Sequence, residues 1–200
     1  ATPFHDILIR ALAVQEVNAA MGVIVAAPTA GGAGVLPAVL TGLASARGIS
    51  DARVIDALAT AGLIGAVIAE RASLSGAEGG CQAETGAAAG MAAGAATEML
   101  GGSPSAAAHA TALAMQSTLG LVCDPLGGLV ELPCVFRNAT GASIALAAIE
   151  MALAGIEFAI PVDEVIDVMG EIGREMDVRY RETAGGGLAA TPTGRRLAKE

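Results

Sequence analysis

The chain has 200 residues, which suits one domain with a substantial hydrophobic core. Its net charge of −9 at pH 7 argues against nucleic acid as a partner, because phosphate backbones require clusters of Lys and Arg. Apolar residues make up 54% of the chain, but with 27 Gly, 3 Phe, 1 Tyr and no Trp the composition favours closely packed helices over sandwiches or barrels, which use more β-branched and aromatic residues.

The first predicted helix covers residues 3–20 and has Thr2 as its N-cap, followed directly by proline. A charge-free run over residues 17–46 is long enough to span a bilayer. Proline and glycine interrupt its middle and no Trp/Tyr belt flanks it, so we expect no membrane insertion. We expect instead a Gly-rich turn at residues 28–34 and a helix over 35–46. The amides at the start of such a helix can bind a carboxylate, although a plain tight turn is the alternative.

The remaining segments read as helices separated by Gly, Ser and Pro. These helices are predicted over residues 51–71, 82–100, 103–119, 138–154 and 161–176. The final stretch, 177–200, is expected to be irregular and to fold back on the body. The sequence therefore predicts an all-α, compact Ala/Gly-rich domain over residues 1–200, with an irregular cysteine-bearing loop at its centre.

That central loop, residues 121–138, is the least regular part of the chain. It contains Cys123 and Cys134, a Gly-Gly pair, and two prolines whose preceding residues are pushed out of the α region. The third cysteine, Cys81, precedes the helix predicted over residues 82–100, where the helix dipole favours a thiolate. Three widely spaced cysteines and the lack of a signal peptide indicate a reducing, cytoplasmic location. The spacing leaves two possibilities open, a metal or cluster site and three inert buried thiols.

Four segments carry a resemblance to a known family: MGVIVAAPTAGGAGVLPAVL, GCQAETG, LGLVCDPLGGLVELPCVFRN and ETAGGGLAATPTG. Together they resemble the iron–sulfur L-serine dehydratases, specifically the alpha chain or catalytic domain, along nearly the whole chain. The resemblance implies a lyase of amino-acid catabolism, which deaminates L-serine to pyruvate and ammonia. It also implies a [4Fe–4S] cluster held by Cys81, Cys123 and Cys134, with one iron open as a Lewis acid for substrate oxygens.

Around such a cluster we expect Thr29, Ala30 and Gly31 to contact the substrate carboxylate, and Asn138 to add a polar contact at the start of its helix. A turn residue and an N-cap are the alternatives for Thr29 and Asn138. His109 is a candidate base, although a core histidine is the plainer interpretation.

Pyridoxal phosphate is not expected as the cofactor. It requires a Schiff-base lysine, and the only lysine in the chain is Lys199, close to its end. Two other functions stay open at this point. One is a cysteine desulfidase with the same type of cluster, and the other is an Ala/Gly-rich membrane or scaffold protein without enzymatic activity.

The sequence also departs from the family pattern. A family catalytic unit normally has more helix before this region, including a Ser/Thr-Gly-Gly-rich segment, and a regulatory beta domain or chain. Neither is found in the 200 residues. We therefore expect a catalytic core that works with a beta chain or domain, or as a homodimer, and that turns over L-serine poorly by itself.

Overall fold

The computed structural model describes residues 2–199 and builds them from helices joined by short loops. The residues described contain no strand, only an isolated parallel bridge between Cys123 and Arg181, so the predicted all-α class is confirmed. The α-helices are α1 (Pro3–Ala19), α2 (Val35–Arg47), α3 (Asp51–Arg71), α4 (Gly76–Gly79), α5 (Ala87–Met99), α6 (Pro104–Gln116), α7 (Cys134–Leu153), α8 (Val162–Glu175) and α9 (Pro192–Leu197). A π-helical segment, η1 (Gln82–Gly86), and three 3₁₀ turns, η2 (Leu126–Gly128), η3 (Val178–Tyr180) and η4 (Gly187–Ala190), complete the chain.

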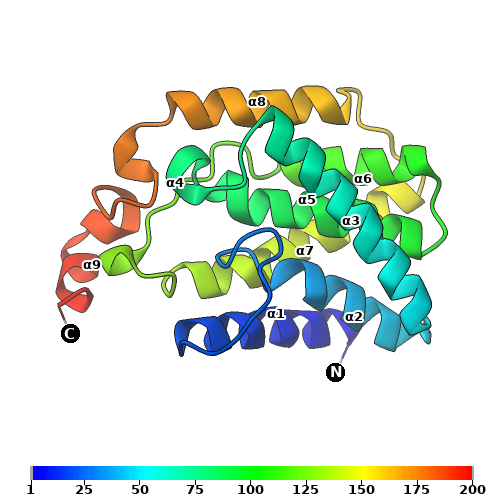
Figure 1. Ribbon diagram of the computed structural model, residues 1–200, viewed down its shortest axis with the longest axis horizontal. Coiled ribbons are helices and arrows are strands. Elements are labelled where there is room, and N and C mark those ends of the chain that lie inside the picture. Colours follow the sequence, from blue (N-terminus) through cyan, green and yellow to red (C-terminus); the bar gives the residue numbers. More distant parts are fainter. Residues whose placement is uncertain (1, 200) are drawn as a thin grey trace.

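Helix α5 lies at the centre of the molecule and packs against α2, α3, α6 and α7 (Figure 1). Every residue from Ala87 to Thr97 is buried, so α5 has no solvent-facing side. This is possible because its side chains are mostly Ala and Gly, which let neighbouring helices approach from all directions. Helices α1 and α2 lie along one side of this core, and α8 lies along the opposite side (Figure 1).

The glycines of these helices differ sharply in what surrounds them. A Cβ on Gly94 in α5 would meet the Thr111 hydroxyl and lie 2.5 Å from a methyl carbon of Ile64, whereas a Cβ on Gly62 in α3 would meet nothing within 4 Å. We expect Gly94→Ala to lower the free energy of unfolding by about 1–3 kcal/mol through overpacking. Gly62→Ala is expected to raise it by up to about 1 kcal/mol, because Ala favours the helix. Urea unfolding of both variants measures this, and equal signs would contradict the packing described here.

Two segments around the central loop differ from the expectation. Helix α7 begins at Cys134, where a helix start at Asn138 was predicted, so Cys134 is helical and Asn138 lies one turn inside. The predicted helix start was wrong because Pro133 is the N-cap, so the helix begins directly after the proline. The stretch expected to be irregular, residues 177–199, contains η3, η4 and the short helix α9.

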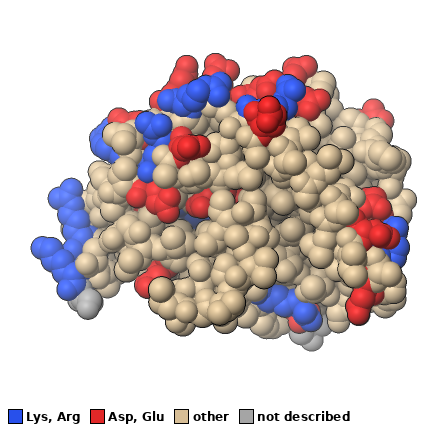
Figure 2. Space-filling model, viewed as in Figure 1, with Lys and Arg blue, Asp and Glu red and all other residues tan. Residues whose placement is uncertain are grey.

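The apolar run at residues 17–46 does not form one long helix. It contains the end of α1, an extended segment with the Gly-rich turn, and most of α2. Within residues 2–199, one helix, α3, is long and apolar enough to cross a membrane by length and composition alone, and 22% of its most apolar window is buried. In Figure 2 charged residues gather along the edge formed by α8 and at the C-terminal end, and much of the remaining face is uncharged.

Candidate metal centre

The three thiols come from three separate segments, and all three are buried. Cys81 follows the left-handed Gly80 and begins the helical run that continues as η1 and α5. Cys123 lies in the loop after α6, where its N–H donates to the Tyr180 carbonyl (2.8 Å) and its carbonyl accepts from the Glu182 N–H (2.9 Å). Cys134 is the first residue of α7. The exposed fractions are 2%, 1% and 3% respectively, and none of the three forms a disulfide.

The thiols differ in how readily they carry charge. A hydrogen bond from the Cys123 thiol lowers the pKa of Cys81, and the nearby Arg137 guanidinium adds to this effect against the opposing effect of burial. The same hydrogen bond, together with burial, raises the pKa of Cys123. Burial raises the pKa of Cys134 to about 12, with a further contribution from negative charge on Cys81. Cys81 is therefore the thiol that ionises first, and metal binding must displace protons from the other two.

Arg137 holds the cysteine loop against α7. Its Nη1 donates to the Val122 carbonyl (2.9 Å) and approaches the Cys81 sulfur at 3.5 Å. Its Nη2 lies 2.7 Å from Asp124 Oδ1, an ionic contact that lacks hydrogen-bond alignment. The other Asp124 oxygen accepts the Leu188 N–H at 2.7 Å. Asp124 and Arg137 thus connect the loop, α7 and the segment that follows α8.

Glu84 is a site residue that the sequence analysis did not single out. It lies in η1, is 8% exposed, and presents a carboxylate oxygen to Cys81 and Cys123, with all three ligand atoms within 4.8 Å of one another. The π-helical segment widens the helix at this point, a feature common at functional sites. A signal was present in the sequence, because a single carboxylate at the start of a deeply buried Ala/Gly helix needs a partner or a function.

The structure brings the Gly-rich turn to the same place. The Thr29 hydroxyl donates to Glu84 Oε1 at 2.8 Å, and Gly31 packs directly on the Glu84 carboxyl. In the described part of the chain the amides of Thr29, Ala30 and Gly31 donate no hydrogen bond, so they remain available to a ligand. Ala30 is exposed, Thr29 is half-buried, and Gly31 is buried.

Asn138 lies behind this turn, and its side chain is fully engaged. Its amide nitrogen donates to the carbonyls of Gly31 (2.7 Å) and Cys134 (2.9 Å). Its oxygen accepts the Gly34 N–H (2.9 Å) and a longer hydrogen bond from Gln15 (3.4 Å). Asn138 is fully buried, so its geometry supports a role in positioning the turn beside α7.

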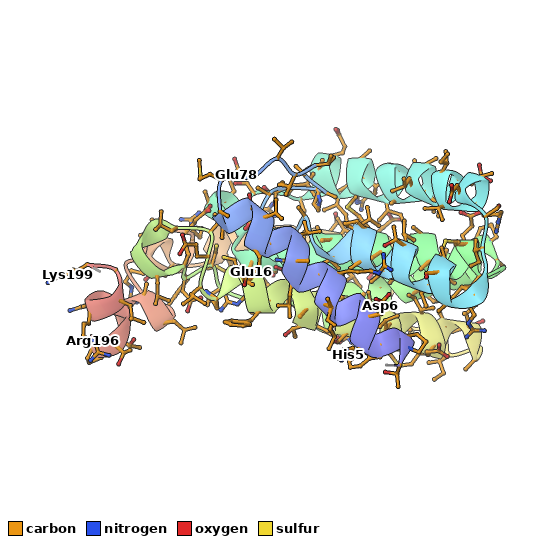
Figure 3. The ribbon with its side chains drawn as sticks, turned by 90° about the horizontal axis from the view of Figure 1, so that it is seen from below. His5, Asp6, Glu16, Glu78, Arg196 and Lys199 are labelled. Atoms are coloured by element: carbon orange, nitrogen blue, oxygen red, sulfur yellow. The ribbon has the colours of Figure 1, made fainter. Side chains whose placement is uncertain are left out.

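His109 is occupied elsewhere. It lies in α6 and is half-buried, and its Nδ1 accepts the backbone N–H of Phe158 at 3.2 Å, in the segment between α7 and α8. The charged and polar groups that act on the thiols are Glu84, Arg137 and Glu182. The second histidine, His5, is exposed in the first turn of α1 (Figure 3).

The donor set fits a cluster held by three thiolates. The sulfurs of Cys81 and Cys123 lie close together beside Glu84, and Arg137 offsets their charge. Cys134 lies outside this close group, but it is buried near enough for charge on Cys81 to raise its pKa. Thiolates are the usual protein ligands of iron–sulfur clusters. Three thiolates leave one iron of a four-iron cluster without a cysteine ligand.

Known proteins match this sequence along almost its whole length. The family model described as "Serine dehydratase alpha chain" matches residues 2–189. A "Probable L-serine dehydratase, alpha chain" from Bacillus subtilis (strain 168) is 56% identical over 195 residues, covering 98% of this chain and 65% of that protein. An "L-serine dehydratase, alpha chain" from Peptoniphilus asaccharolyticus is 46% identical, covering 98% and 68%. "L-serine dehydratase TdcG" from Escherichia coli (strain K12) is 46% identical, covering 90% of this chain and 40% of its own length.

Proposed function

We infer the function of this chain from its family: it belongs to the serine dehydratase alpha-chain family. We propose that it forms the cluster-binding core of an enzyme that deaminates L-serine to pyruvate and ammonia. One observation carries the proposal. The buried thiols of Cys81 and Cys123 meet beside the buried carboxylate of Glu84, with the buried Cys134 near them, in a chain that matches the family model over residues 2–189.

In this proposal Cys81, Cys123 and Cys134 hold a [4Fe–4S] cluster. When bound, it supplies an iron that polarises the substrate's hydroxyl and carboxylate oxygens. The free amides of the turn at Thr29, Ala30 and Gly31 bind the substrate carboxylate, as backbone N–H groups at a helix start do for anions. Asn138 positions that turn through its four hydrogen bonds. Arg137 offsets the charge of the ionised thiols.

The proposal does not use pyridoxal phosphate. The only lysine of the 200 residues, Lys199, is exposed and lies close to Arg196 at the C-terminal end of the molecule (Figure 3). A Schiff base at that lysine would form on the surface, outside the hollow that Thr29 and Glu84 line.

We further propose that the active enzyme contains a beta chain. Relatives that this chain matches over 98% of its length are named alpha chains, and it spans 65% of the length of the Bacillus protein. A cytoplasmic location suits three free thiols and a cluster, because both require a reducing compartment.

The function is tested by assaying pyruvate formation anaerobically, with this chain assembled with its beta chain and reconstituted with iron and sulfide. We expect turnover of L-serine to exceed that of L-cysteine, which separates deamination of serine from desulfidation. We also expect activity to fall in air and to return with iron and a reductant, because an iron without a thiolate ligand is open to oxidants. Activity that is indifferent to air and blocked by carbonyl reagents would contradict the proposal.

A further inference from the structure

Glu84 is a buried acid with few partners. Its Oε1 accepts one hydrogen bond, from the Thr29 hydroxyl at 2.8 Å, and only 8% of the residue is exposed. None of the salt bridges among residues 2–199 includes Glu84. Burying a carboxylate without a compensating cation or several donors is costly, so natural proteins retain such groups where a ligand completes them.

Two glycines let the backbone approach this carboxyl closely. A Cβ on either Gly31 or Gly76 would lie 2.7 Å from Glu84 Oε2, so any larger residue at these positions would displace it. On its open side Glu84 lines a hollow of about 460 Å³, together with Pro28, Thr29, Ser75 and Glu78. Glu84 therefore lies between this hollow and the thiols of Cys81 and Cys123.

The surroundings of Glu84 are negative. Burial raises the pKa of its carboxyl, the Thr29 hydroxyl opposes this, and the charge of Glu182 raises it further. A group that enters the hollow and contacts Glu84 is thus favoured when it is a cation that donates hydrogen bonds.

We propose that Glu84 binds the α-ammonium group of the substrate and thereby selects amino acids over hydroxy acids. The inference rests on the proposed function, since that function requires an amino acid at this site. Next to Glu84, the free amides of Thr29, Ala30 and Gly31 are donors for a carboxylate. Acceptor and donors are thus placed side by side, as the two charged ends of an amino acid require.

The test uses the complete enzyme, assembled with its partner chain and reconstituted anaerobically, and compares Glu84→Gln with the wild type. Gln keeps the shape and removes the charge. L-Alanine and L-lactate serve as probes, because they differ only in ammonium against hydroxyl and lack the leaving group. We expect calorimetry to show wild-type preference for L-alanine, and Glu84→Gln to weaken L-alanine binding about 10–100-fold. Affinity for L-lactate, iron content and the visible spectrum are expected to stay unchanged.

Glu98→Gln is the matched control, because the Glu98 carboxylate also accepts a threonine hydroxyl, from Thr60 at 2.8 Å, but lies at the other end of α5, outside this hollow. This variant should bind both probes as the wild type does. If Glu84→Gln does not fold, Thr29→Val replaces it in the test. This change keeps the backbone amide and removes the hydroxyl bonded to Glu84. It should weaken the binding of L-alanine by about 5-fold and leave the binding of L-lactate unchanged.

The outcomes separate the two proposals. Loss of iron in Glu84→Gln would make Glu84 a cluster ligand and overturn the inference. The inference would also be overturned if Glu84→Gln bound L-alanine as the wild type does, if it lost affinity equally for both probes, or if the wild type did not prefer L-alanine. In each of these cases turnover of L-serine by the wild type would still support the proposed function. A wild-type assembly that binds no iron or does not turn over L-serine would overturn the proposed function, and this inference with it.

Discussion

Cys81→Ala, Cys123→Ala and Cys134→Ala will each lose stable cluster binding. The chain has only three cysteines, and all three are buried, so no other thiol of the chain can replace a missing one. Removing a group that merely supports a metal ligand costs about 10–100-fold in affinity or activity, so removing a ligand should cost more than about 100-fold in activity. Iron and sulfide content and visible absorption after anaerobic reconstitution measure the effect.

The matched control for these variants is Met99→Leu, which removes a buried sulfur at the far end of α5. It should retain the full cluster and the full activity. Circular dichroism checks that all four variants fold, which we expect because Ala in place of a buried thiol leaves only a small void. If a cysteine variant keeps its complete iron content, that cysteine is not a ligand of the cluster.

Arg137→Gln is expected to lower the free energy of unfolding by about 3–5 kcal/mol, because it leaves the carboxylate of Asp124 buried without its counter-charge. The side chains of this pair are 17% and 3% exposed, and the pair connects α7 to the cysteine loop. Urea unfolding of Arg137→Gln, Asp124→Asn and the double variant forms a cycle. We expect a coupling of about 1–3 kcal/mol, since the two side chains are in direct contact.

Arg71→Gln is the control for that cycle. Arg71 makes a two-point contact with Asp167, with a shortest distance of 2.6 Å, but the two side chains are 41% and 51% exposed. A pair exposed to this degree should be worth at most about 1 kcal/mol, because water screens its charges. Equal costs for Arg137→Gln and Arg71→Gln would show that the buried pair does not hold the cysteine loop.

Local signals in the sequence determined the secondary structure well. Thr2 and Ser103 cap helices whose first residue is proline, and Gly48 ends α2 in the left-handed conformation. These effects act within a few residues, so composition and pattern were enough to predict an all-α chain with α3 at residues 51–71. The three cysteines were equally visible, because thiols in an otherwise inert chain are few and chemically distinctive.

The face on which a helix packs was less predictable. In α3 the large apolar side chains Ile55 and Leu58, of the kind that ordinarily mark the core face of a helix, are 65% and 47% exposed. The buried stripe consists of the small residues and one isoleucine at Ala57, Ala61, Gly65 and Ile68. The neighbouring helix α5 determines which face of α3 is buried. Because α5 presents Ala and Gly, the two helices approach most closely where α3 also presents small side chains.

The site itself depended on contacts between distant residues. Thr29 and Glu84 are 55 positions apart, and Asn138 reaches Gly31 across 107. No local propensity relates such residues, so the sequence revealed the Gly-rich turn and the thiols but not that Glu84 joins them. The tertiary structure decided this through burial. Burial of η1, which continues into α5, removed water from Glu84, and the remaining hollow, the free amides and the thiols became its surroundings.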